Sequence, residues 1–253
     1  MTAALELINL SIRFGGVTAV DGVTASIAVG EFVGLIGPNG AGKTTLIRLI
    51  TGILPPDTGE VKLLGANVTR EATAARMRKG LALTHQIVRP FRAMTVLDNV
   101  VLAAGHRWTA NPLTALFHVS RRDEIDAAMV ILAKVGLAGT EKKLAAAFPL
   151  GQLKRLEMAR ALALTPTVIL LDEPLAGLNH AEAMTQAETI LAINQQGVTV
   201  VLVEHNLEQV IRVCRRLIVL NGGRIIADGE PRTVMDDAGV REAYIGAGRE
   251  AHA

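Results

Sequence analysis

The 253-residue chain has little cysteine, few aromatic residues and almost no net charge. Its single cysteine, Cys214, excludes an internal disulfide and is typical of a reducing compartment. A net charge of +2 and an aromatic content of 3% argue against a nucleic-acid-binding surface. Such a surface needs clustered cations for the phosphates and aromatic rings for unpaired bases.

Long apolar segments are also missing. Hydrophobic residues make up 50% of the chain, yet no uncharged apolar run approaches the roughly 18–20 residues that cross a bilayer. Residues 1–10 have no basic region followed by a long apolar core, so they do not resemble a secretory signal. We therefore expect a cytoplasmic protein that forms one globular domain, or two closely packed lobes, with an ample core.

The most informative segment is residues 37–44, whose sequence GPNGAGKT matches the phosphate-binding pattern GxxxxGK[ST]. It follows an apolar run at 32–36, which predicts a strand, and it leads into a helical pattern at 45–50. Glycines leave backbone N–H groups free to surround a phosphate chain, and a helix N-terminus adds positive charge. We expect Lys43 to contact the terminal phosphates of ATP and Thr44 to ligate Mg²⁺. A plain Gly-rich turn is the alternative.

Another apolar run, at 168–171, ends in two adjacent carboxylates, Asp172 and Glu173, followed by Pro174. In open α/β sheets, ligands bind at the C-terminal ends of the parallel strands. Asp172 is therefore a candidate for the Mg²⁺ shell, and Glu173 for the group that orients or deprotonates the attacking water. A strand that ends in a solvated turn is the alternative, and the P-loop upstream favours the nucleotide site.

The rest of the pattern predicts a mixed α/β chain. Residues 95–164 are helical in pattern, with Ile125, Met129, Leu132 and Val135 at helical spacing. Apolar runs and turn residues predict further elements: strands at 5–10, 23–29, 60–64 and 198–203, a crossover helix at 181–196, and a hairpin that turns at residues 221–222.

Together these motifs resemble the ATP-binding subunit of an ATP-binding cassette (ABC) transporter. Residues 148–152 (FPLGQ) resemble the signature motif LSGGQ, and residues 175–179 (LAGLN) occupy the D-loop position. Gln86 stands where the family has its Q-loop glutamine, and His205 matches the switch histidine. Phe14 is placed like the aromatic residue that stacks on adenine. A solvated glutamine, a structural histidine and an aromatic at the core edge are the alternatives.

The resemblance implies a role for each matching residue. The catalytic group comprises Glu173, His205, Gln86 and Lys43. Mg²⁺ is assigned to Thr44, Gln86 and Asp172. The residues assigned to ATP are Phe14, Gly37, Pro38, Asn39, Gly40, Ala41, Gly42, Lys43, Thr44, Thr45, Gly151 and Gln152.

The implied fold is an α/β P-loop ABC ATPase core with a mixed, largely parallel sheet, an antiparallel β subdomain and an inserted α-helical subdomain. Residues 1–253 form a single ABC ATPase domain in this assignment. Within it, 1–92 and 165–235 make the nucleotide-binding core with the β lobe. Residues 93–164 make the helical subdomain with the signature motif, and 236–253 a C-terminal helix and tail.

Two positions depart from the common family pattern. Pro149 replaces the signature serine, so Gly151 and the N-terminus of the following helix remain to bind the γ-phosphate. Asn179 replaces the usual D-loop aspartate. Gly-Leu-Asn in the D-loop and Glu-His-Asn at the switch resemble the subgroup that serves branched-chain amino acid permeases. Segments 105–122 and 239–246 resemble the same subgroup.

The resemblance implies an ATPase that powers uptake of branched-chain or related amino acids. ATP would be clamped between two such subunits, identical or different. Both would bind two transmembrane permease subunits at the cytoplasmic face of the inner membrane, and a periplasmic or extracellular binding protein would deliver the solute. Another polar or carboxylated solute is one alternative. A soluble ABC ATPase acting on nucleic acid is another, disfavoured by the charge balance. A regulator that does not hydrolyse ATP would be expected to lack Glu173 or Lys43.

Overall fold

The computed structural model of the chain describes residues 2–84, 88–105, 121–205 and 207–250. Its strands are β1 (Ala3–Phe14), β2 (Val17–Ala28), β3 (Phe32–Ile36), β4 (Thr58–Leu63), β5 (Ala66–Asn67), β6 (Leu81–Thr84), β7 (Val168–Asp172), β8 (Thr199–Val203), β9 (Arg216–Asn221) and β10 (Arg224–Gly229). Its helices are α1 (Lys43–Thr51), α2 (Thr73–Arg78), α3 (Val96–Ala104), α6 (Arg122–Lys134), the 3₁₀ turn η1 (Ala145–Ala147), α7 (Leu150–Ala163), α8 (His180–Gln195), α9 (Leu207–Val213), α10 (Pro231–Asp236) and α11 (Ala238–Glu250).

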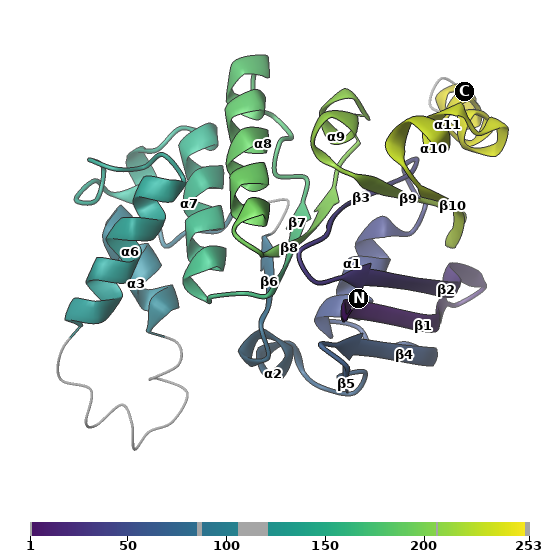
Figure 1. Ribbon diagram of the computed structural model, residues 1–253, viewed down its shortest axis with the longest axis horizontal. Coiled ribbons are helices and arrows are strands. Elements are labelled where there is room, and N and C mark those ends of the chain that lie inside the picture. The colour runs from purple at the N-terminus through teal and green to yellow at the C-terminus, as the bar shows by residue number, and fades with distance from the viewer. Residues whose placement is uncertain (1, 85–87, 106–120, 206, 251–253) are drawn as a thin grey trace.

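A six-stranded sheet with the order β10-β9-β3-β8-β7-β6 forms the centre of the fold (Figure 1). Five of these strands run parallel, and β10 is antiparallel to β9. Strands β3 and β8 are buried at every position, as expected for parallel strands that are covered on both faces. The strands predicted at 32–36, 168–171 and 198–203 are thereby confirmed, whereas β6, four residues long, was not predicted.

A second, antiparallel sheet has the order β2-β1-β4-β5. Strand β1 is longer than the predicted strand at 5–10, because irregular pairing carries it past Asn9. Asn9 has a φ of 49°, and its backbone N–H donates to the Thr24 hydroxyl at 2.9 Å. A bulged strand continues after such a residue, although the apolar pattern is interrupted. Helix α1 packs its apolar face between the two sheets (Figure 1).

The β9–β10 hairpin turns one residue later than predicted. Asn221 pairs with Arg224, so the two turn residues are Gly222 and Gly223 rather than residues 221–222. Their φ values are 52° and 79°, and two-residue hairpins of this kind need positive φ at both central positions. Gly223 donates its N–H to the Ala41 carbonyl at 3.0 Å. The hairpin tip therefore packs on the P-loop.

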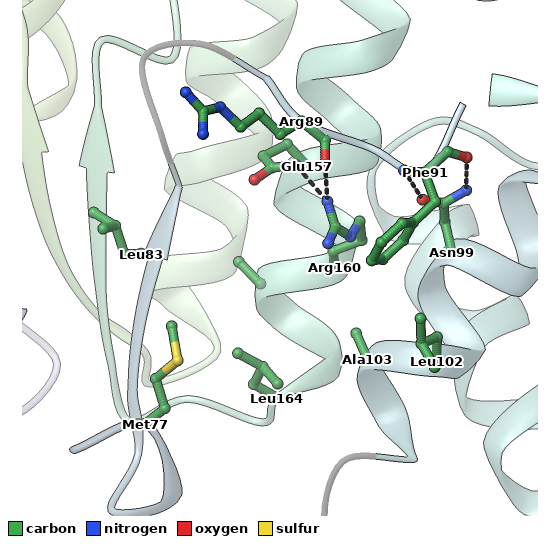
Figure 2. Close-up of a pocket in the computed structure, with 11 residues that line it drawn as sticks. Met77, Leu83, Arg89, Phe91, Asn99, Leu102, Ala103, Glu157, Arg160 and Leu164 are labelled. Carbon is green, nitrogen blue, oxygen red and sulfur yellow. Dashed lines mark hydrogen bonds and ion pairs between the residues drawn. The ribbon is translucent and has the colours of Figure 1, made fainter. Parts of the chain in front are cut away.

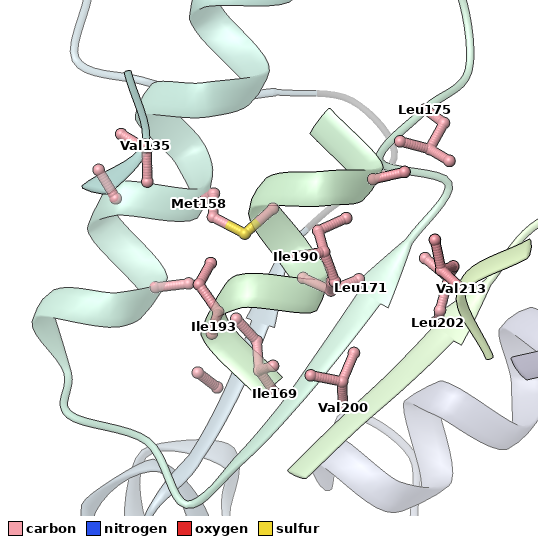
Figure 3. Packing of buried hydrophobic residues seen from close by; sticks show 14 of the residues in the cluster. Val135, Met158, Ile169, Leu171, Leu175, Ile190, Ile193, Val200, Leu202 and Val213 are labelled. Carbon is pink, nitrogen blue, oxygen red and sulfur yellow. The ribbon is translucent and has the colours of Figure 1, made fainter. Parts of the chain in front are cut away.

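The core divides into two apolar clusters, one on each face of the six-stranded sheet. Alternate residues of each strand belong to opposite clusters, as the pleat requires. Ile169 of β7 and Val200 of β8 pack against Met158 of α7 and Ile193 of α8 (Figure 3). The opposite face, which includes Leu170, packs against α1 and the antiparallel sheet. Among the described residues, no helix combines the length and the apolar character needed to span a bilayer.

Helices α3, α6 and α7 pack together at one side of the sheet (Figure 1). Leu132 is buried on the inner face of α6, whereas Ile125 and Met129 are 38% and 41% exposed. The buried face of α6 instead runs through Glu124, Ala128 and Leu132. The helical pattern predicted from Ile125, Met129 and Leu132 is confirmed, because all three lie in α6.

Candidate functional site

The loop between β3 and α1 closely contacts its neighbours through its glycines. Gly42 has a φ of 103°, and a Cβ added there would lie 2.4 Å from the carbonyl oxygen of Ala19 in β2. A Cβ on Gly37 would lie 2.1 Å from the carbonyl oxygen of Leu220 in β9. Only glycine can adopt this backbone conformation at position 42 and also fit the space beside β2. The backbone of the phosphate loop is therefore held from two sides.

Lys43 is the first residue of α1, and its side chain turns back over this loop. The ammonium group donates hydrogen bonds to the carbonyl oxygens of Gly37 at 2.6 Å and Pro38 at 3.0 Å. Burial lowers the pKa of Lys43, and the negative charges of Glu173 and Asp172 oppose that shift. The structure thus brings the loop cation and both predicted carboxylates together.

Glu173 follows β7 in a left-handed backbone conformation, with a φ of 49°. Non-glycine residues rarely adopt this region, and such strain gathers at functional sites. The Glu173 N–H donates to the Val203 carbonyl at 2.9 Å, and its own carbonyl accepts from Lys154 Nζ at 2.8 Å. Its side chain is 22% exposed.

His205 lies beside two carboxylates. Its Nδ1 is 3.9 Å from Glu173 Oε1 and 3.8 Å from Glu204 Oε2. The imidazole is 59% exposed, whereas Glu204 is 1% exposed, and burial raises the pKa of Glu204. The other oxygen of Glu204 accepts a hydrogen bond of 2.7 Å from the backbone N–H of Leu175. Glu204 thus connects the histidine turn to the segment after Glu173.

Sequence reasoning missed Lys154 and Glu204. The available signal for Lys154 was weak, because α7 also carries the cations Arg155 and Arg160. For Glu204, the signal was a carboxylate at the end of an apolar strand. Neither pattern identifies a contact, because Lys154 and Glu173 are 19 residues apart and meet only because α7 packs along β6, the strand beside β7.

The signature and D-loop segments contact each other within this chain. Pro149 is the N-cap of α7, and Gly151 is buried in the first turn. A Cβ on Gly151 would lie 3.0 Å from Glu182 Oε1, so its nearest neighbours belong to α8 rather than to the P-loop. Asn179 caps α8: its side-chain oxygen accepts the Glu182 N–H at 2.9 Å, and Glu182 accepts the Asn179 N–H at 3.1 Å. Asparagine therefore has a structural use at this D-loop position.

The remaining candidates lie at different distances from this centre. Thr44 is exposed and Thr45 half-buried in the first turn of α1. Phe14 is 49% exposed at the end of β1 and pairs with Val17. Strand β2 then passes Gly42 at Ala19, only two residues after Val17. Gln152 is half-buried in α7. Gln86 and the segment 106–120 lie outside the described residues.

Comparison with known proteins decides the family. Residues 20–176 match the family model described as ABC transporter. The chain belongs to the ABC transporter family. This ABC protein is 36% identical over 248 residues to BraF of Pseudomonas aeruginosa, a high-affinity branched-chain amino acid transport ATP-binding protein, with 96% of this chain and 97% of that protein covered.

Solved ABC cassettes share its fold. MJ1267, an ATP-binding cassette of an ABC transporter in its ADP conformation, has a TM-score of 0.86 and 33% identity, with 97% of this chain and 100% of that chain covered. MJ0796, in a dimeric post-hydrolysis state bound to ADP and Pi, has a TM-score of 0.77 and 25% identity, with coverage of 90% and 99%. The predicted family, the fold and the assignment as an ABC ATPase are confirmed.

The cassette also carries an open groove of about 430 Å³ between α3, α7 and β6 (Figure 2). Asn99 holds Phe91 through hydrogen bonds of 2.9 and 3.0 Å, yet the Phe91 ring stays 47% exposed. Arg160 lies 5.0 Å from the centre of that ring. It also donates hydrogen bonds of 2.9 Å to Glu157 and to the Arg89 carbonyl. An exposed but fixed aromatic ring beside an arginine is typical of a surface that contacts another protein.

Proposed function

We propose that this chain is the ATP-hydrolysing subunit of an importer for branched-chain or related amino acids. The observation that carries the enzymatic part is the charge arrangement at the phosphate loop, where Asp172 and Glu173 face Lys43. The similarity to BraF along nearly the whole chain supports the solute class. Another polar or carboxylated solute is the alternative within transport, since solute specificity lies in the permease and the solute-binding protein.

The phosphates of ATP are assigned to the backbone N–H groups of the loop and to Lys43. The constraint on Gly42 supports this, because a side chain there would displace the loop from β2. The N-terminus of helix α1, which begins at Lys43, supports the same assignment. Phe14, exposed beside the strand that packs on the loop, is the candidate for stacking on adenine. The proposed phosphate-binding set is Gly37, Pro38, Asn39, Gly40, Ala41, Gly42, Lys43, Thr44 and Thr45.

Mg²⁺ is assigned to the Thr44 hydroxyl and the Asp172 carboxylate, with Gln86 as the third candidate. Among the described residues, no group of three or more His, Cys, Asp and Glu is arranged to hold a metal. This fits Mg²⁺, which takes one or two protein oxygens and completes its shell with phosphates and water. When bound, the ion neutralises charge on the phosphates.

Glu173 is the proposed general base. Its carboxylate is partly exposed at the strand end, and it lies near both Lys43 and His205. Its proposed task is to orient the attacking water and take its proton. His205 would hold the water and the γ-phosphate in place, which is the positioning work on which phosphoryl transfer depends.

Two copies of the cassette, or this chain and a related subunit, would share each ATP. The dimeric structure of MJ0796 with ADP and Pi supports such a pairing. Gly151 and Gln152, on the segment 93–164 that we assign to a helical subdomain, would close the site of the partner. The neighbours of Gly151 within the chain belong to α8, so it does not close its own phosphate loop.

The groove of Figure 2 is our candidate for the permease contact. Its lining includes Leu83 and Arg89, each three residues from Gln86 along the chain, and it is bounded by α7, the signature helix. A permease segment bound in this groove would contact both the residues near Gln86 and the signature helix α7. We assign the protein to the cytoplasmic face of the membrane, held there by two permease subunits, with a solute-binding protein acting outside.

Glu173→Gln tests the catalytic proposal, because the amide keeps size and hydrogen bonding but cannot take a proton. ATP hydrolysis should fall by roughly a hundredfold or more. With Mg²⁺ and ATP the variant should elute as a larger species in size-exclusion chromatography, alone or with a paired subunit. Glu188→Gln, on an exposed side chain of α8, is the matched control and should hydrolyse ATP like the parent.

Retained hydrolysis in Glu173→Gln would remove Glu173 from catalysis. Lost hydrolysis without ATP-dependent association, even with the partner subunit present, would contradict the shared site. Co-purification with permease subunits, followed by an ATPase assay with each branched-chain amino acid and its binding protein, tests the solute. Stimulation by a different solute class would overturn the amino acid assignment.

A further inference from the structure

Lys154 connects the signature helix to the backbone of Glu173. It lies in α7, one turn after Gly151, and it is 6% exposed. Its ammonium group donates a hydrogen bond of 2.8 Å to the Glu173 carbonyl oxygen. A lysine is rarely buried to this extent unless it is paired. The contacts of the ammonium group therefore compensate for its burial.

The segment that Lys154 contacts is held at three successive points. The N–H of Glu173 donates to the Val203 carbonyl at 2.9 Å, and the carbonyl of Glu173 accepts from Lys154. The N–H of Leu175 donates to the Glu204 carboxylate at 2.7 Å. Glu173 has a φ of 49°, and a glutamate keeps this strained conformation only where its surroundings fix the backbone. Of these three contacts, the one from Lys154 is the only one that comes from the helical side of the molecule.

Charge adds a second link between the same residues. Glu204 is 1% exposed, and its Oε2 has no hydrogen-bond partner among the described residues. The negative charges of Glu204 and Glu173 both act on the buried ammonium group of Lys154. A buried cation near negative charge resists displacement, because removing it leaves uncompensated charge.

We propose that Lys154 is a positioning residue for ATP hydrolysis, which fixes the backbone of Glu173 and makes the aim of its carboxylate depend on the position of the signature helix. This inference rests on the proposed role of Glu173. A movement of α7 against β7 would lengthen the Lys154 contact and release the Glu173 turn. Hydrolysis would then be fast only when α7 is seated as in this structure. Nucleotide binding, which uses the phosphate loop, does not need this contact.

Lys154→Met removes the donor and the charge but keeps the length of the side chain. In the full chain, assembled with its partner and permease subunits, kcat for ATP should fall roughly 10- to 100-fold, while KM and ATP affinity change by no more than about twofold. Lys154→Arg keeps a cation with N–H donors and should recover most of kcat. The matched control is Lys134→Met in α6, whose ammonium group donates to Gln196 Oε1 at 2.8 Å, away from Glu173. It should behave like the parent.

Thermal unfolding of each variant separates positioning from folding. Lys154→Gln, which is polar but too short to reach the carbonyl, carries the same test if Lys154→Met fails to fold. A parental kcat in the folded variant would overturn the proposal, as would a loss of ATP affinity equal to the loss of kcat. An arginine variant no better than the methionine variant would overturn it as well. If Glu173→Gln keeps hydrolysing, the proposed function fails instead, whatever Lys154 does.

Discussion

The ammonium group of Lys43 donates a hydrogen bond to the carbonyl oxygen of Gly37, 2.6 Å away. The lysine thus closes the loop that it belongs to. Burial lowers the pKa of the ammonium group, and the nearby negative charges of Glu173 and Asp172 oppose that shift. A cation held above the loop is therefore in place before ATP arrives.

Lys43→Ala should weaken ATP binding and reduce turnover together. The phosphates lose a charged donor worth about 1.5–3 kcal/mol, which is roughly a 10- to 100-fold loss of affinity. Calorimetry with ATP and a phosphate-release assay measure the two effects. The circular dichroism spectrum should stay that of the parent. Hydrolysis near the parental rate would contradict our assignment of the site.

Phe14→Ala should weaken ATP binding by about 1 kcal/mol or somewhat more, because a stacking surface is lost. Turnover at saturating ATP should hardly change. The ring is 49% exposed, so unfolding stability should also stay close to that of the parent. Val17→Ala, at the exposed residue that pairs with Phe14, controls for effects on the hairpin. Unchanged affinity by calorimetry would return Phe14 to a structural role at the sheet edge.

Gly151→Asp should abolish turnover, whereas Pro149→Ser should be tolerated and would restore a hydroxyl donor at the helix start. In the shared site, an aspartate would place negative charge against the γ-phosphate. The side chain would also meet Glu182 of its own chain, 3.0 Å from the added Cβ. The double variant Gly151→Asp with Glu182→Gln separates the two effects. Recovery of ATPase activity in the double variant would mean that repulsion within the chain, and not the nucleotide, caused the loss.

Arg76→Met should destabilise the fold. The guanidinium group is 1% exposed and donates hydrogen bonds to four backbone carbonyls, two of them at the end of α1. Those carbonyls would be left buried without donors, at a cost of about 3 kcal/mol or more in the free energy of unfolding. Arg78→Met, an exposed position on the same helix, is the control. Urea denaturation that shows a loss below about 1 kcal/mol would contradict this role.

The sequence alone predicted the elements whose structure follows from their own residues. Residues 32–36 are apolar throughout, and a strand of that kind is stable only when covered on both faces, as β3 is. The P-loop spacing predicted its own turn, because glycine at position 42 permits a backbone that no other residue adopts there. The apolar run at 168–171 likewise predicted the strand β7, which ends at the first of two adjacent carboxylates, Asp172.

Tertiary packing decided what depends on contacts between distant segments. The turn at Gly222 and Gly223 is one residue beyond the predicted site, because the hairpin tip must meet Ala41. The outward position of Ile125 follows from the neighbours of α6, which no local period reveals. Lys154 is another such case: its hydrogen bond with Glu173 spans 19 positions and forms because α7 packs along β6, the strand beside β7. The sequence determined which chemical groups the site contains, and only the folded chain decided which of them meet.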